Sequence, residues 1–129
     1  MQCRQFGAEV HVYELLPNAV LKAQKISPAH AQAAYTATLA PYVKPHALNL
    51  ALHPSGKSYD SYQFAKKIES YQVLQCFIGG AYGFEKGFLK LCECVSLSAM
   101  TMSHKIAKLM LCEQIYRALS ILHAHPYHK

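Results

Sequence analysis

The sequence predicts an α/β fold, in which helices cover both faces of a mostly parallel sheet. Three observations support this fold class. Apolar segments with the two-residue period of strands alternate along the chain with segments of helical character. A continuous apolar run, residues 73–78, ends in two glycines, as strands buried on both faces often do. The 129 residues are 52% hydrophobic and 16% charged, which predicts a single globular domain spanning residues 1–129.

The first half of the chain is expected to form two strands with a helix between them. Residues 8–16 alternate between apolar and polar side chains and are predicted to form the first strand. A serine cap followed by a proline in the first turn predicts a helix from Ser27 through an alanine-rich stretch to Ala40. Residues 47–52 alternate again and predict a second strand, and residues 53–57 are expected to turn the chain.

A second helix is expected to begin at Asp60 or Ser61, either of which can cap it, and to turn Phe64 and Ile68 inward. The buried strand at residues 73–78 follows this helix. The remaining sequence again alternates between segments with the period of a helix and segments with the period of a strand.

A short helix is predicted at residues 85–92, a brief strand at 95–97, and the longest helix from about 103 to 123. Apolar residues cover most of the circumference of this last helix: Ile106, Leu109, Met110, Cys112, Ile115, Leu119 and Leu122. A helix this apolar must be buried on more than one side. We therefore predict a homodimer, in which a second copy covers the additional side.

The formal net charge of +6 is unevenly distributed along the chain. Residues 15–59 contain lysines but no acidic residue, and Glu113 is the sole acidic residue after Cys94. Basic surface of this kind attracts a phosphate backbone, although an ordinary solubilising lysine surface explains the charge equally well. Charge alone therefore suggests a nucleic-acid partner without establishing one.

The cysteines and the hydropathy pattern indicate a cytoplasmic protein. Five cysteines form an odd set without a disulfide framework, and most lie in apolar stretches, as expected in a reducing compartment. No apolar run approaches the roughly 20 residues that a membrane-spanning helix needs. The Cys92-x-Cys94 spacing is a weak indication of a metal, because structural zinc sites usually need wider spacing and further ligands.

Glycines follow the buried strand at residues 79–83, where a parallel sheet commonly binds ligands. Their spacing matches neither a dinucleotide-binding fingerprint nor a phosphate-binding loop. Residues 96–104 are rich in hydroxyl groups, which can bind an adenine edge or a ribose. Each segment has a simpler interpretation, because the glycines can form a plain turn and the hydroxyl groups can cap the helix that follows.

Charged and aromatic residues gather near the C-terminus. Glu113 and Arg117 have the favourable i, i+4 spacing, and an ion pair on so apolar a helix indicates a site or an interface. The tail from His123 to Lys129 is rich in histidine, so a metal cluster and a frayed terminus are both possible interpretations. We expect no metal site and favour a tail that closes over a substrate.

Taken together, four motifs resemble the RlmH family of SPOUT methyltransferases. They are Phe-Ile-Gly-Gly-Ala-Tyr-Gly at 77–83, Ser-Leu-Ser-x-Met-Thr-x-x-His at 96–104, Leu-x-Glu-Gln-Ile-Tyr-Arg-Ala at 111–118 and His-Pro-Tyr-His-Lys at 125–129. Residues 52–61 resemble a further Leu-Asp-x-x-Gly-Lys…Ser segment of that family. The combination is specific, and the resemblance extends over nearly the whole chain.

The resemblance implies a SPOUT-type fold with a C-terminal trefoil knot. It also implies transfer of a methyl group from S-adenosylmethionine to N3 of a pseudouridine in 23S ribosomal RNA. The substrate would be large-subunit rRNA within the assembled ribosome, and the enzyme would be a homodimer. Carried over by motif, the residues of the cofactor pocket would be Leu52, Gly79, Gly80, Leu97, Ser98, Ala99, Met100, Thr101 and Met102.

Four residues are expected to act on the RNA. His104 and His128 are the candidate bases for the imide proton, because histidine titrates near neutral pH. Arg117 would stabilise developing charge or hold a phosphate, and Tyr127 would stack on or orient the uracil. Glu113 is expected to orient Arg117.

Two departures from the family pattern accompany the resemblance. His53 stands where the family usually has aspartate, and members usually begin with a strand and a helix ahead of a segment like residues 2–6, so we expect the usual first strand to be missing. A non-catalytic RNA-binding or interaction protein, derived from this family and truncated at its N-terminus, is therefore the alternative function. An unrelated nucleotide-binding α/β enzyme is a third hypothesis.

Overall fold

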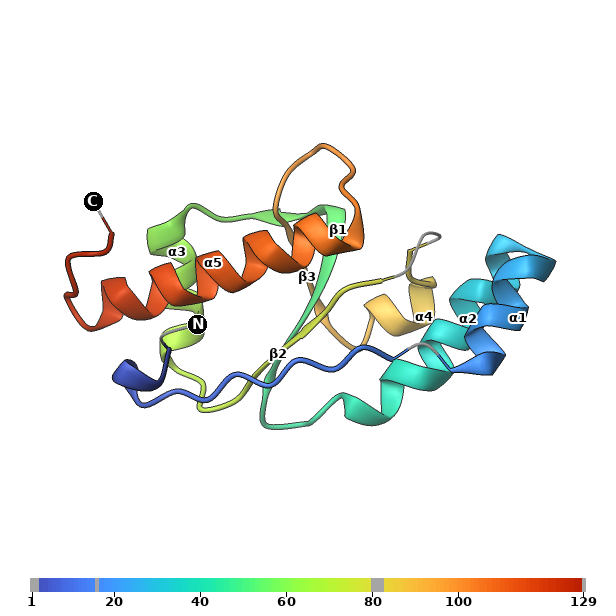
Figure 1. Cartoon of the computed structure of the whole chain (residues 1–129), viewed down its shortest axis with the longest axis horizontal. Helices are drawn as coiled ribbons and strands as arrows, with labels where there is room; N and C mark the ends of the chain where they lie inside the picture. The colour runs from blue at the N-terminus through green and yellow to red at the C-terminus, as the bar shows by residue number, and fades with distance from the viewer. Residues whose placement is uncertain (1–2, 16, 80–82, 129) are drawn as a thin grey trace.

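The computed structural model describes residues 3–15, 17–79 and 83–128 (Figure 1). Its sheet has three strands in the order β2-β1-β3, and both pairings are parallel. The strands are β1 (Leu48–Ser58), β2 (Leu74–Phe77) and β3 (Glu93–Ser96). The predicted α/β class with a mostly parallel sheet is thus confirmed.

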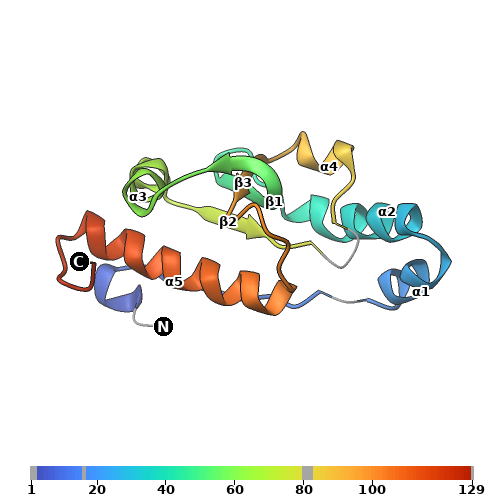
Figure 2. The same ribbon diagram turned by 90° about the horizontal axis from the view of Figure 1, so that it is seen from above.

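Helices precede, connect and follow the strands. They are η1 (Cys3–Phe6), α1 (Asn18–Ile26), α2 (Pro28–Leu39), η2 (Ala40–Tyr42), α3 (Ser61–Glu69), α4 (Lys86–Leu89) and α5 (His104–Leu122). The predicted caps are observed, because the side chain of Ser27 accepts from His30 N and that of Asp60 accepts from Gln63 N. Viewed from above, α5 runs alongside the sheet, with α1 and α2 displaced toward one end of the molecule (Figure 2).

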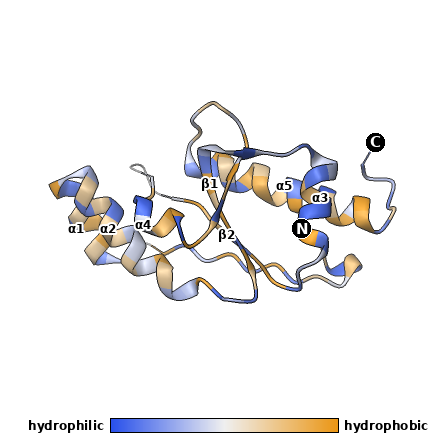
Figure 3. Ribbon diagram, turned by 180° about the vertical axis from the view of Figure 1, so that it is seen from behind, coloured by the Kyte–Doolittle hydropathy of each residue, from blue (hydrophilic) through white to orange (hydrophobic). Residues whose placement is uncertain are grey.

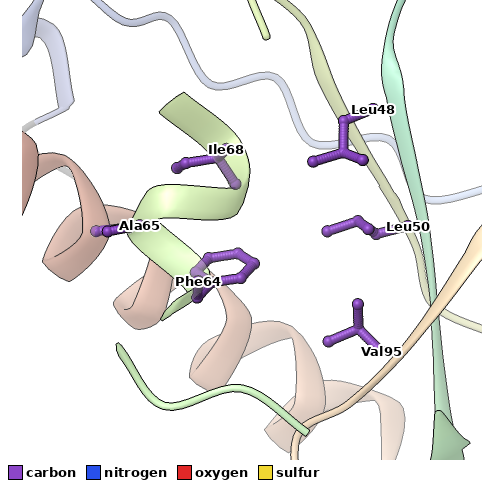
Figure 4. Close-up of a cluster of buried hydrophobic side chains, with 7 residues drawn as sticks. Leu48, Leu50, Phe64, Ala65, Ile68 and Val95 are labelled. Carbon is purple, nitrogen blue, oxygen red and sulfur yellow. The ribbon is translucent and has the colours of Figure 1, made fainter. Parts of the chain in front are cut away.

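Hydrophobic packing holds α3 and α5 to one face of the sheet. Leu48 and Leu50 of β1 point toward Phe64 and Ile68 of α3, with Val95 of β3 beside them (Figure 4). Ala118 brings the C-terminal half of α5 into the same cluster, and hydrophobic residues occur along the length of that helix (Figure 3). Leu50 is completely buried, so this cluster anchors the elements that form the candidate site described below.

The opposite face of the sheet packs against α4 and the end of α2. Ala51 points away from Leu50, because successive side chains of a strand face opposite sides. It contacts a cluster in which the rings of Phe77 and Phe84 both pack on Phe88 of α4. Helices therefore cover both faces of the sheet, as the sequence predicts.

The prediction of a strand at residues 8–16 is wrong, because the described residues 8–15 form no strand. Alternation normally indicates one buried face, but here Val10 and Val12 are 41% and 54% exposed. No described strand lies beside them to supply backbone hydrogen bonds, and Glu14 instead pairs with Lys108 of α5. The structure also contains helix α1, which the sequence reading did not predict.

The turn predicted at residues 53–57 is also wrong, because these residues belong to β1. The strand is irregular there, and Leu52 and Lys57 both lie opposite Val95 of β3. Pro54 and Gly56 therefore produce a bulge and not a reversal of the chain. The helices and strands predicted after residue 60 are confirmed with shifted ends, and α4 and β2 are shorter than predicted.

Among the described residues, no helix is both long and apolar enough to cross a membrane. The trefoil knot that the resemblance implies stays a prediction. The N-terminal helix η1 and the C-terminal end of α5 lie together at one end of the molecule, opposite α1 and α2 (Figure 1).

Candidate active site

A cavity of about 300 Å³ lies between the sheet, α3 and α5. Its size is at the lower end of the range for small-molecule sites. Its wall includes two of the predicted cofactor residues, Leu52 of β1 and Leu97 just after β3, together with Ser96. On the helical side it is lined by Ser61 of α3 and Gln114 of α5. The end of β3 thus opens onto a pocket with mixed apolar and polar walls.

The loop from Leu97 to Met102 joins β3 to α5 and is ordered by its own hydrogen bonds. The buried Ser96 donates from Oγ to the Ser98 carbonyl over 2.9 Å, and Met100 N donates to Ser98 Oγ over 3.1 Å. Met100 is 76% exposed, and Ala99 and Thr101 are exposed too. Of the predicted loop residues, only Leu97 lines the cavity, while Ser98 and Met102 are half-buried elsewhere.

The glycine segment is described only in part. Gly79 is half-buried against the ring of Phe84 and does not line the cavity. The predicted cofactor residue Gly80 lies outside the described residues. The structure therefore brings Leu52 and Leu97 together at one pocket but does not join Gly79 to them.

Glu113, in the middle of α5, is the centre of a cluster with the chain's C-terminal tail. We call it the tail cluster: Glu113, Arg117, Tyr127 and His128. Its Oε1 accepts from Arg117 Nε at 3.0 Å, from Arg117 Nη2 at 2.7 Å and from the Tyr127 hydroxyl at 3.0 Å. The guanidinium carbon of Arg117 also lies 5.0 Å from the centre of the Tyr127 ring. The Glu113–Arg117 pair expected from the sequence therefore orients the tail directly.

The tail cluster fixes the charge of its members. Hydrogen bonds from Arg117, and more weakly from Tyr127, lower the pKa of Glu113 below its ordinary value despite partial burial. The hydrogen bond to the Glu113 carboxylate in turn raises the pKa of Tyr127. At neutral pH Glu113 is thus an acceptor, while Tyr127 stays protonated and remains a donor.

The ring of His128 has a defined orientation. Arg117 Nη1 lies 3.1 Å from His128 Nδ1, and the His128 ring stands perpendicular to that of Tyr62, with centroids 4.7 Å apart. A guanidinium can only donate, so Nδ1 must be the acceptor. The neutral ring then carries its hydrogen on Nε2, and in this arrangement His128 offers a donor there and not a base.

Gln114 connects the tail cluster to the cavity. Its Nε2 donates to Glu113 Oε2 over 2.8 Å, and its Oε1 accepts from Ser61 Oγ over 2.8 Å. Gln114 and Ser61 both line the cavity, so the carboxylate that holds the tail is one residue from the pocket wall. Sequence reasoning missed both as site residues, although Gln114 lies inside the 111–118 motif and Ser61 inside the 52–61 segment.

His104 is separate from the other predicted catalytic residues. It is the first residue of α5, thirteen positions before Arg117 in the same helix. At a rise of 1.5 Å per residue the two backbones are about 20 Å apart along the helix axis. The structure thus brings Arg117, Tyr127 and His128 together and places His104 at the other end of α5, beside the 97–102 loop.

The other histidines near the C-terminus pack against the N-terminal segment. The ring of Phe6 stacks on His123 with centroids 5.1 Å apart and is nearly perpendicular to His125, with centroids 5.4 Å apart. Gln5 also donates to the Tyr116 hydroxyl over 2.7 Å. In the described part of the chain, no group of three histidine, cysteine or acidic side chains is arranged to hold a metal ion.

The cavity lies where β3 ends, and the tail cluster lies beside it. This is the edge of a parallel sheet at which α/β proteins commonly bind small ligands. A family described as predicted SPOUT methyltransferase matches residues 2–128. The chain therefore belongs to the SPOUT methyltransferase family. The resemblance to its RlmH members is confirmed by the curated relatives.

Three such relatives come from Helicobacter species, and each is named ribosomal RNA large subunit methyltransferase H. The protein of Helicobacter hepaticus (strain ATCC 51449 / 3B1) is 67% identical over 130 residues, covering 100% of this chain and 85% of the relative. Those of Helicobacter acinonychis (strain Sheeba) and Helicobacter pylori (strain HPAG1) are 53% and 52% identical over 128 residues, covering 99% of this chain and 85% of each relative.

Proposed function

We propose that this chain is a methyltransferase of large-subunit ribosomal RNA, which uses S-adenosylmethionine to modify N3 of a pseudouridine in 23S rRNA. The observation that carries the proposal is the hydrogen-bonded connection from the cavity through Gln114 to the tail cluster. This connection supports a nucleobase-binding role for the tail cluster and a cofactor-binding role for the cavity. The names of the relatives support an rRNA substrate, and the motifs support the particular nucleotide.

The residues present fit the proposed cofactor. Leu52 and Leu97 offer apolar surface for an adenine ring, and the pocket adds hydroxyl groups at Ser61 and Ser96. Thr101 is exposed on the loop after β3, so its hydroxyl is accessible to a ligand. The other proposed contacts are Gly79, Gly80 and the loop residues Ser98, Ala99, Met100 and Met102. When bound, S-adenosylmethionine supplies an electrophilic methyl group.

The tail cluster is proposed to hold the acceptor uracil ring. Tyr127 can stack on the ring, while the Nε2–H of His128 can donate to a carbonyl oxygen of the base. Arg117 uses three of its five N–H donors within the cluster, which leaves two for a carbonyl oxygen or a phosphate. Positioning of this kind supplies much of the rate enhancement when two groups must meet in line.

The imide proton of the acceptor needs a base. Since Arg117 occupies Nδ1 of His128, we propose His104 as the base, and this requires the two ends of α5 to meet. Within one chain they are about 20 Å apart, whereas reacting groups must come within about 3 Å of one another. A second copy of the chain can supply the missing end, so the proposed enzyme is a homodimer.

Exposed apolar residues support this dimer. Ile106 and Leu109 of α5 are 54% and 70% exposed, and Met110 beside them is 37% exposed. Leu109 and Met110 follow Ile106 by three and four positions, so all three share one side of the helix. The N-terminal segment, which Glu14 ties to Lys108, adds the exposed Val12 nearby. We propose that this surface packs against its symmetry mate.

The test is methylation of purified large ribosomal subunits by the chain with labelled S-adenosylmethionine, followed by mapping of the modified nucleotide. We expect one modified pseudouridine, a higher melting temperature in saturating S-adenosylmethionine, and a dimer by sedimentation. RNA binding without stabilisation by S-adenosylmethionine would instead favour the non-catalytic alternative. Stabilisation by NAD or ATP would favour an unrelated nucleotide-binding enzyme.

We further propose that the reaction occurs on the assembled ribosome in the cytoplasm.

A further inference from the structure

Helices α1 and α2 form a small unit at the end of the molecule opposite the tail cluster; we call it the helical arm (residues 18–39; Figures 1 and 2). It has a core of its own, in which Val20 of α1 packs against Ala31 and Tyr35 of α2. Gln24 also donates to the Tyr35 hydroxyl over 2.6 Å. The arm is therefore held together by contacts between its two helices, which leaves the outer side of α1 free.

The outer side of α1 carries two lysines. Val20 and Ala23 are buried and define the inner side of the helix. Lys22 and Lys25 lie on the opposite side, are both exposed, and are three positions apart, so they are neighbours on the helix surface. The exposed Leu21 flanks them. Neither lysine contributes to the core of the arm.

The charge of this side is not neutralised. No acidic residue occurs between positions 15 and 59, and within the described residues Lys22 and Lys25 form no ion pair. Elsewhere in the molecule several cations are paired: Lys67 with Glu93, Lys108 with Glu14, and Arg117 with Glu113. The ammonium groups of α1 are therefore available to an external anion.

We infer that the outer side of α1 binds the phosphate backbone of ribosomal RNA, as a second contact distant from the tail cluster. This inference rests on the proposed function, which supplies an RNA substrate. Two adjacent, unpaired lysines on a helix are suited to successive phosphates, because each can displace a condensed counterion from the backbone. An RNA strand fits this side better than a lipid surface, because only Leu21 and Ile26 would enter a bilayer.

The test compares the double variant Lys22→Gln/Lys25→Gln with the unmodified chain. Binding to purified large ribosomal subunits is measured between 50 and 200 mM salt, and the KM for methylation of the same particles is determined. Removing two phosphate contacts should lower the slope of log affinity against log salt by about 2 and raise KM roughly tenfold. The kcat and the thermal shift with S-adenosylmethionine should be unchanged, because the lysines lie far from the cavity.

The matched control is Lys66→Gln/Lys90→Gln, which removes two exposed positive charges from α3 and the end of α4. Equal effects of the two double variants would mean that the arm contributes only its share of the net positive charge, and this would overturn the inference. So would an unchanged KM and salt slope in the arm variant while the unmodified chain methylates ribosomes. If the unmodified chain binds ribosomes in an arm-dependent way without methylating them, the proposed function fails and the arm contact stands. Loss of ribosome binding in every form would overturn both.

Discussion

Gly56 of β1 lies so close to Cys94 of β3 that a Cβ atom on the glycine would stand 2.6 Å from the Cys94 carbonyl carbon. The same Cβ would also be 2.7 Å from the backbone nitrogen of Val95. Both contacts are with backbone atoms, which cannot rotate away as a side chain can. The glycine of the 52–61 segment is therefore required for the approach of two strands.

Gly56→Ala should destabilise the fold. The two strands must separate to accept the methyl group, and overpacking of this kind costs about 1–3 kcal/mol in the free energy of unfolding. Urea denaturation, followed by circular dichroism, measures the free energy of unfolding of the variant and of the unmodified chain. Gly87→Ala in α4 is the matched control, because a Cβ there meets nothing within 4 Å and alanine favours a helix. Equal stability of the two variants would contradict the close approach.

Removal of the tail should separate cofactor binding from catalysis. His128→Ala, or deletion of residues 127–129, should abolish methyl transfer while S-adenosylmethionine still raises the melting temperature. Tyr127→Phe should have an intermediate effect, because it keeps the ring over Arg117 and loses the hydroxyl bond to Glu113. Normal turnover in the His128 variant would show that the tail does not take part in the reaction.

The docking of the tail should depend on pH through Glu113. Because its pKa is lowered in the folded protein, its contribution is complete above the ordinary value of 4.5 and is lost as the pH falls through the lower folded value. The raised pKa of Tyr127 acts in the opposite direction, so its contribution is present below 10.0 and is lost as the pH rises through the folded value. The tail should therefore stay docked across the neutral range.

This pH dependence can be followed by the NMR signals of the Tyr127 ring. Glu113→Gln removes the carboxylate, so its variant should lack the acid transition and hold the tail more weakly at pH 7. If the transition persists in that variant, another group controls docking.

Leu109→Glu should prevent dimerisation without unfolding the chain. Leu109 is 70% exposed, so the charged side chain reaches water in a single copy but would be buried between two copies. Sedimentation velocity should report a monomer with an unchanged circular dichroism spectrum, and methyl transfer should fall by at least tenfold. Ala33→Glu, at an exposed position of α2, is the control and should leave the dimer intact. An active monomer would contradict the proposal that His104 acts across two copies.

Much of the fold was predictable because local signals and packing agree. The serine–proline start at Ser27 and the capping box at Asp60 define helix ends within a few residues of sequence. The segment containing Val10 and Val12 misled because alternation records a half-buried face only when a neighbouring strand exists. The bulge at Gly56 misled for the opposite reason: turn-forming residues were placed inside a strand by its partner, β3.

The candidate site was predictable as a set of motifs and not as a geometry. Arg117, Tyr127 and His128 were named from the sequence, and they do lie together. The role of Gln114 could not be seen, because its partner Ser61 is 53 positions away and their contact depends on the packing of α3 against α5. The separation of His104 follows from simple counting along the predicted helix.

The central position of β1 has a consequence for synthesis of the protein. Both of its neighbours, β2 and β3, are later in the chain, so β1 emerges from the ribosome before either partner has emerged. At about 5–20 residues per second, β3 follows roughly a few seconds later. During that interval the apolar side chains around Leu50 have no sheet to enter. The nascent chain should therefore be most prone to aggregation, and most dependent on chaperones, between the emergence of β1 and that of β3.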